Sequence, residues 1–226
     1  EENYCPQSIM TYGSVYTKGL GHDECADHHT NGGYSSQITV KQDFVYHAPD
    51  SMGLEYVAPL LCAGITMFGP LNRHVLKKEG KKSVGILGFG GLGQMGVKLA
   101  KVMGADVTVL SRSTSKKDQA EALGAELVAH GDEEAMKSIA NKFDVIVDTV
   151  AVSHDIQPFI PTLKVGATYV FIGAVPQPVS LSPLVLLFKN LHLIGAKEAS
   201  AHFDAMRSGA SDAERAVIDM STLKDL

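Results

Sequence analysis

Apolar and polar residues follow two different patterns along this chain, and the change falls near residue 83. Beyond it, short apolar runs alternate with segments in which apolar residues recur every three or four positions, as in "GLGQMGVKLAKVMG". The first pattern is typical of buried strands and the second of amphipathic helices. Six strands are predicted, at "SVGILG", "DVTVLS", "AELVAH", "FDVIVDTV", "ATYVFIG" and "LHLIG".

Further helices are predicted between these strands, at "SKKDQAEALG", "DEEAMKSIAN" and "SPLVLLFKN", with a broken helix at "HDIQPFIPTLK". Alternating strands and helices favour a parallel sheet, because parallel neighbours need a crossover connection, which a helix supplies. Six strands in two halves of three indicate a doubly wound, six-stranded parallel Rossmann sheet. This α/β fold binds dinucleotides.

Residues 1–60 have another character, with several glycines and short β-like runs such as "YSSQITV" and "DFVYHAP". Such segments are typical of a small antiparallel β domain with loops. The sequence therefore divides into a β-rich part at 1–60, a nucleotide-binding part at 61–195 and a tail at 196–226. One short amphipathic helix is predicted in the tail.

Composition and charge narrow the classes of function. Aspartate and glutamate outnumber lysine and arginine by 25 to 20, so no basic surface for nucleic acid is expected. The longest apolar run, residues 57–68, is interrupted by Pro59 and is too short to cross a bilayer; no charged-then-apolar leader opens the sequence. The three cysteines are widely spaced and do not form a disulfide framework. We therefore expect a cytoplasmic protein without a membrane or nucleic-acid partner.

A glycine-rich turn follows the first predicted strand of the sheet. Gly88, Gly90 and Gly93 have the spacing G-x-G-x-x-G at the point where a helix begins. In dinucleotide-binding folds these glycines permit a tight turn, let backbone amides approach a pyrophosphate, and bring the helix close to the strand. The alternative is a turn that serves helix packing alone. Cofactor contacts are predicted at Gly88, Gly90, Gly91, Leu92 and Gly93.

The turn after the second strand of the sheet, "VLSRSTSKK", lacks the acidic residue that usually binds the ribose 2′-hydroxyl of NAD. It offers hydroxyl groups and cations instead, at Ser111, Arg112, Ser113 and Lys116. Such groups bind a 2′-phosphate, which a carboxylate would repel. The pattern favours NADP(H) as the cofactor. The alternative is that these cations are solvated surface charges.

Cysteine and histidine residues raise a separate question about metals. Cys62 lies in "APLLCAGIT", and a cysteine in such an apolar run is often a small buried hydrophobe. The stretch "HDECADHH" holds His22, Cys25, His28 and His29. Their spacing matches no zinc motif, so a polar surface loop is the better interpretation.

Several stretches of the sequence together resemble one known family. They are "EENYCP", "GGYSSQITV", "APLLCAGIT", "GILGFGGLGQMGVKLAKVMG", "VTVLSRS" and "DVIVDTV". In this order they are similar to the zinc-dependent medium-chain alcohol dehydrogenases, and most similar to the cinnamyl alcohol dehydrogenase group. The resemblance covers residues 1–195 and implies that the β-rich part is a partial GroES-like catalytic domain.

The resemblance also implies roles for single residues. Cys62 would be a thiolate ligand of a catalytic Zn²⁺, Thr66 would contact the nicotinamide, and Cys5 would be the last thiolate of a structural zinc. The implied reaction is hydride transfer between NADP(H) and primary alcohols or aldehydes, including aromatic, cinnamyl-type ones. Further cofactor contacts are expected after two later strands, at Thr149, Val150, Gly173 and Ala174.

Two hypotheses about function follow from this resemblance. The family's other ligands of the catalytic zinc, and the first three thiolates of the structural zinc, precede the position that aligns with Glu1. The chain is therefore either a zinc-dependent NADP(H) oxidoreductase or a truncated, non-catalytic NADP(H)-binding protein. A zinc-free quinone reductase is a weaker third hypothesis, because Cys62 and Cys5 argue against it. The edge strands "ATYVFIG" and "LHLIG" are retained, which allows a homodimer through the sheet edge.

Overall fold

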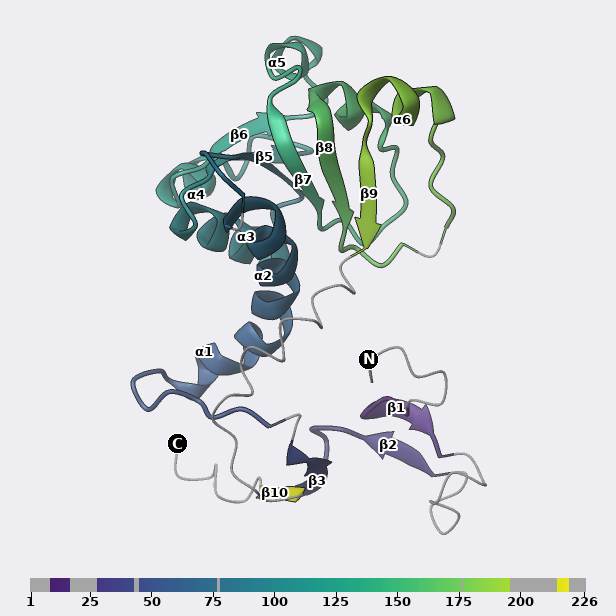
Figure 1. Cartoon of the computed structure of the whole chain (residues 1–226). Coiled ribbons are helices and arrows are strands. Elements are labelled where there is room, and N and C mark those ends of the chain that lie inside the picture. Colours follow the sequence, from purple (N-terminus) through teal and green to yellow (C-terminus); the bar gives the residue numbers. More distant parts are fainter. Residues whose placement is uncertain are drawn as a thin grey trace. The chain divides into compact units, whose positions relative to one another are not determined.

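The computed structural model describes residues 9–16, 28–42, 45–76, 78–175, 177–195 and 215–219 (Figure 1). The chain forms two compact units. The smaller unit combines Glu1–Pro49 with Phe203–Leu226, and the larger unit is Asp50–His202.

The described part of the smaller unit contains two antiparallel strand pairs. β1 (Tyr12–Val15) pairs with β2 (His29–Asn31), and β3 (Gln37–Lys41) pairs with β10 (Arg215–Asp219). The predicted strand in "YSSQITV" is confirmed as β3. Residues 45–49 of "DFVYHAP" are not in a strand, so that prediction is wrong for them.

Residues 215–219 are a strand, so the helix predicted for the tail is wrong at this point. Five consecutive residues of β10 pair with β3, from Arg215 opposite Lys41 to Asp219 opposite Gln37. Pairing satisfies backbone N–H and C=O groups of both strands. A short helix at residues 215–219 would leave those groups of β3 to water, and a helix of this length is only marginally stable in water. Tertiary context thus overrides a weak amphipathic pattern.

A six-stranded parallel sheet forms the centre of the larger unit. Its order is β6-β5-β4-β7-β8-β9, so the first strand of the sheet lies inside it and chain order reverses between β4 and β7. The predicted doubly wound fold and all six strands are confirmed. The strands are β4 (Ser83–Leu87), β5 (Asp106–Ser111), β6 (Glu126–Ala129), β7 (Phe143–Asp148), β8 (Leu163–Phe171) and β9 (His192–Gly195).

Helices cover both faces of this sheet (Figure 1). The helical elements of the larger unit are α1 (Leu54–Pro59), η4 (Leu60–Gly64), α2 (Ile65–Leu71), η5 (Asn72–Leu76), α3 (Gly91–Val102), α4 (Lys117–Ala122), α5 (Glu133–Ser138), η6 (Gln157–Thr162) and α6 (Pro183–Lys189). One hydrophobic cluster joins α2, α3 and α4 to the sheet, and the other joins α5, η6 and α6 to it. Because both faces are buried, the central strands β4 and β7 are mostly apolar, with the aspartates of β7 at positions 144 and 148.

Residues 54–76 form one uninterrupted helical path that includes two prolines. The expectation that Pro59 interrupts this segment is wrong, since the wider π-helical turn η4 follows Pro59 and η5 follows Pro70. Proline removes a backbone donor and crowds the preceding turn, and a π-helical turn is one way to absorb both effects.

The same segment is long and apolar. Among the described residues, Leu54–Leu76 passes a test of length and hydropathy for a membrane-crossing helix. Its second half packs inside the larger unit, where Met67 and Leu71 are fully buried. Gly96 of α3 makes this packing close, because a Cβ atom there would overlap the Met67 methyl carbon.

Candidate dinucleotide-binding site

The carboxyl ends of β4 and β7 lie side by side at the centre of the sheet, where strand order reverses. Thr149, just after β7, ties the two ends together: its backbone N–H and its hydroxyl both donate to the Leu87 carbonyl, at 3.0 and 2.8 Å. In open α/β sheets, ligands bind in the crevice outside the strand ends at such a reversal. The predicted site residues Gly88, Thr149 and Val150 all lie there.

The glycine turn has the backbone that its sequence predicts. Gly88 has a φ of +89°, and a Cβ atom on it would lie 2.8 Å from the Thr149 hydroxyl oxygen. A Cβ atom on Gly93 would overlap the Gly88 carbonyl oxygen. Both positions therefore require glycine, one for backbone conformation and one for the close approach of α3 to β4.

Open space lies beside the first residues of α3. Cβ atoms placed on Gly90 and Gly91 would meet no described atom within 4 Å. Gly90 is the N-cap residue, and no described side chain caps the helix there. Leu92 is half-buried and packs on the apolar core. The unpaired N–H groups of a helix start attract anions, so this end of α3 can receive a pyrophosphate.

The loop after β5 carries the predicted 2′-phosphate ligands. Ser111 ends the strand, while Arg112, Ser113 and Lys116 are exposed. The Lys116 ammonium group donates to the Phe89 carbonyl oxygen at 3.3 Å, which brings this loop to the glycine turn. Lys116 thus lies beside the glycine turn, and residues 111–117 include no carboxylate. This arrangement fits a phosphate on the 2′-oxygen.

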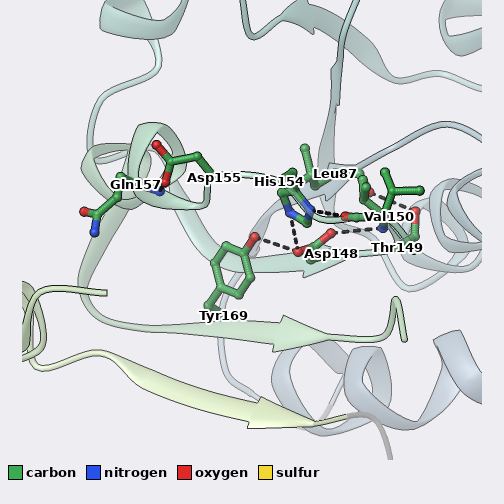
Figure 2. A network of polar contacts seen from close by, with 9 residues as sticks. Leu87, Asp148, Thr149, Val150, His154, Asp155, Gln157 and Tyr169 are labelled. Atoms are coloured by element: carbon green, nitrogen blue, oxygen red, sulfur yellow. Dashed lines mark hydrogen bonds and ion pairs between the residues drawn. The ribbon is translucent and has the colours of Figure 1, made fainter. Parts of the chain in front are cut away.

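A buried carboxylate organises the segment that follows β7. Asp148 is the last residue of that strand, and 1% of its side chain is exposed. Figure 2 shows its partners: the Val150 N–H donates to Oδ1 at 3.0 Å, and the Tyr169 hydroxyl donates to Oδ2 at 2.9 Å. His154 Nε2 lies 2.9 Å from the same Oδ2. Every carboxylate oxygen is therefore hydrogen-bonded, as a buried charge requires.

Tyr169 contributes a reliable donor to this network. Burial, together with the negative charge and hydrogen bond of Asp148, raises the pKa of the Tyr169 hydroxyl far above its ordinary value. The hydroxyl keeps its proton at physiological pH and always donates. Its ring is fully buried beside Phe171 in the core that covers the second face of the sheet.

The end of β8 approaches the same segment. The N–H groups of Ile172 and Gly173 donate to the Asp148 carbonyl oxygen at 2.9 and 3.0 Å. A Cβ atom on Gly173 would overlap the Val150 carbonyl oxygen, so only glycine allows this approach. Ala174 follows and is exposed. The predicted residues at the ends of β7 and β8 thus lie next to one another.

Cys62 and Thr66 lie on the long helical segment. Cys62 is exposed in η4, so the interpretation of this thiol as a buried hydrophobe is wrong. Thr66 is half-buried in α2, about one turn further along. Their proposed contacts with zinc and nicotinamide stay predictions.

Metal ligands are scarce in the part of the chain that the structure describes. It contains no group of three or more His, Cys, Asp and Glu side chains placed to hold a metal ion. Cys5, His22 and Cys25 lie outside the described residues, while His28 and His29 are exposed. Cys62 alone supplies one thiolate, so the described residues do not complete a zinc site.

The polar network around Asp148 was not predicted from the sequence. A signal for it existed, because Asp148 ends the otherwise apolar run "VIVD" and is the one charged residue in it. A charge at the end of a buried strand needs partners. Its partners His154 and Tyr169 have no sequence pattern of their own.

Comparisons with known proteins show the family of the chain. The zinc-binding dehydrogenase family matches residues 91–211. A probable cinnamyl alcohol dehydrogenase from Populus deltoides is 42% identical over 189 residues, which are 82% of this chain and 50% of that protein. The chain thus spans about half the length of the curated relatives it matches.

Solved structures give the same result. A cinnamyl alcohol dehydrogenase from Sorghum bicolor is 34% identical with a TM-score of 0.78, over 97% of this chain and 69% of that one. The enzyme from Helicobacter pylori, complexed with NADP(H), is 28% identical with a TM-score of 0.72 over the same shares. The resemblance to cinnamyl alcohol dehydrogenases predicted from the sequence is confirmed, and the chain belongs to the zinc-binding dehydrogenase family.

Proposed function

We propose that the chain is the NADP(H)-binding part of an oxidoreductase that interconverts primary alcohols and aldehydes, including aromatic, cinnamyl-type ones. The observation that carries the proposal is the uncapped start of α3 beside open space, with Lys116 bonded to Phe89 in the adjacent glycine turn. The names of the relatives support the reaction class.

Each part of the cofactor has candidate contacts. The start of α3 would hold the pyrophosphate, and the loop after β5 would hold the 2′-phosphate. The two halves of a doubly wound sheet each hold one mononucleotide. The adenosine half then lies toward β5 and the nicotinamide half toward β7 and β8, where Thr149, Val150, Gly173 and Ala174 are expected to contact it. Bound NADPH supplies the hydride that reduces an aldehyde.

Among the described residues, Cys62 is the one candidate thiol ligand for zinc. Cys62 is exposed and carries a thiol, which suits Zn²⁺. The further ligands of a zinc ion bound to Cys62 would come from residues outside those described.

Cofactor titration tests the first half of this proposal. Purified chain is titrated with NADPH and with NADH, and nicotinamide fluorescence and calorimetry report the two dissociation constants. A 2′-phosphate held by charge-assisted contacts predicts roughly tenfold or tighter binding of NADPH. Equal affinity for both cofactors would contradict the NADP(H) assignment, and binding of neither would contradict the dinucleotide site.

The second candidate function is non-catalytic NADP(H) binding. One observation favours it: the described residues offer a single thiolate rather than a complete metal site. Oxidation of NADPH in the presence of cinnamaldehyde separates the two candidates. Tight NADPH binding without turnover, in zinc-supplemented buffer, is the result that this alternative predicts for the chain.

A further inference from the structure

We propose that Asp148 is a positioning residue for the nicotinamide half of the cofactor, acting together with His154 and Tyr169. The inference rests on the proposed function. The Asp148 carboxylate contacts Val150, His154 and Tyr169 (Figure 2), and we infer that these contacts hold the ends of β7 and β8 in the arrangement that receives this half.

Asp148 joins two strand ends through both its side chain and its backbone. Its carboxylate accepts from the Val150 N–H, two residues further on. Its carbonyl oxygen accepts from the N–H groups of Ile172 and Gly173 at the end of β8. Residues expected to contact the cofactor are therefore direct neighbours of Asp148 on both strands. The carboxylate itself is buried beneath them, so it acts through them.

His154 closes the loop that follows β7. Its Nδ1 lies 2.9 Å from the Val152 carbonyl oxygen, and its Nε2 lies 2.9 Å from Asp148 Oδ2. The ring thus spans the loop from Val152 back to Asp148 and ties the residues after β7 to the carboxylate at its end.

Another aspartate of the same strand provides a matched comparison. Asp144, near the opposite end of β7, accepts from the Ser83 N–H at 2.8 Å and from the Lys164 ammonium group at 2.9 Å. Like Asp148 it is partnered across neighbouring strands, but it lies at the amino end of β7, away from the glycine turn. Loss of either aspartate removes hydrogen bonds that hold the sheet together. Only loss of Asp148 changes the strand ends at the site.

The affinities for two ligands distinguish a positioning role of Asp148 from general support of the fold. NADPH carries both halves of the cofactor, whereas adenosine 2′,5′-bisphosphate carries the adenosine half and its 2′-phosphate alone. Calorimetry measures both affinities for the wild-type chain and for Asp148→Asn and His154→Gln. We expect both variants to bind NADPH roughly tenfold more weakly or worse, because a buried charged hydrogen bond is lost. Adenosine 2′,5′-bisphosphate should bind within about twofold of wild type.

Controls distinguish a loss of positioning from a loss of folding. Thermal unfolding is measured for every variant, and Asp144→Asn is expected to lower the midpoint without changing either affinity. Where Asp148→Asn does not fold, Tyr169→Phe removes one donor to Oδ2 and keeps the buried ring, so it should weaken NADPH selectively. Equal weakening of both ligands, or no weakening in folded variants, would overturn the positioning role. A wild-type chain that binds neither ligand would overturn the proposed function itself.

Discussion

The start of α3 lies so close to the end of β4 that a Cβ atom on Gly93 would overlap the carbonyl oxygen of Gly88. No flexible side chain can yield at this contact, because the obstacle is backbone. The glycine turn is therefore fixed by sterics as well as by the φ of Gly88.

Gly93→Ala should consequently distort the turn and weaken NADPH. We expect a loss of about 1–3 kcal/mol in the free energy of unfolding, typical of overpacking, and a larger loss of cofactor affinity. Urea unfolding and fluorescence titration measure the two effects. Gly131→Ala is the control, because a Cβ atom there meets no described atom within 4 Å. Unchanged NADPH affinity in Gly93→Ala would mean that the turn serves packing alone.

Replacing the cations of the loop after β5 should change cofactor preference. Arg112→Ala and Lys116→Ala should each weaken NADPH by about 1.5–3 kcal/mol, because a charge-assisted phosphate contact is lost. NADH has no 2′-phosphate and should bind nearly as before. Lys117→Ala is a matched control, since Lys117 is exposed and pairs with Glu121 on α4. The solvated-charge interpretation predicts no difference among the three variants, and calorimetry with both cofactors decides between them.

Acid should destabilise the larger unit through His130. Burial, with the nearby charges of Arg112 and His154, lowers the pKa of His130 below its ordinary value of 6.5. The unfolded chain therefore binds this proton at a higher pH than the folded chain does. Stability from neutral His130 is complete above pH 6.5 and is lost as the pH falls from there through the folded-state pKa.

Urea unfolding of the wild-type chain and of His130→Gln at about pH 7.5 and about pH 5.5 tests this predicted loss of stability in acid. The variant should lose less stability on acidification than the wild-type chain does. His192→Gln, at an exposed position of β9, should keep the wild-type loss. An identical pH dependence in all three proteins would remove His130 as a cause.

The exposed position of Cys62 has consequences for its reactivity and its energetics. The thiol should react with a thiol reagent in the native protein, and peptide mass mapping locates the label. Cys62→Ala should change the free energy of unfolding by no more than about 0.5 kcal/mol, as exposed substitutions usually do. Met67→Ala, at a fully buried position of the same helical segment, should cost about 2–5 kcal/mol. A large loss in the free energy of unfolding of Cys62→Ala would show that the Cys62 side chain is buried after all.

Zinc content tests the proposed role of the same thiol. One thiolate does not hold a catalytic zinc, so the chain should retain little metal at this position after dialysis against a weak chelator. Metal analysis should give the same zinc content for the wild-type chain and for Cys62→Ala. A stoichiometric zinc lost only in Cys62→Ala would show that other residues of this chain complete the site.

Much of the larger unit was predictable from sequence because its signals are local. Apolar runs, helical spacing and the G-x-G-x-x-G turn each involve residues close together in the chain. All six strands overlap the predicted stretches, although β8 begins earlier, at Leu163, inside the predicted broken helix. The turn at Gly88–Gly93 and the loop at Ser111–Lys116 likewise follow from short stretches. The structure brings them together because parallel strands place their carboxyl ends at one edge of the sheet.

Features that depend on distant partners were decided by tertiary structure alone. Asp148 meets Tyr169 from 21 residues away, and β3 meets β10 from the other end of the chain. The helix continues through Pro59, and the π-helical turn η4 begins at the next residue. Sequence patterns report the preferences of neighbouring residues, whereas a buried charge or an unpaired strand is satisfied by whatever the fold places beside it.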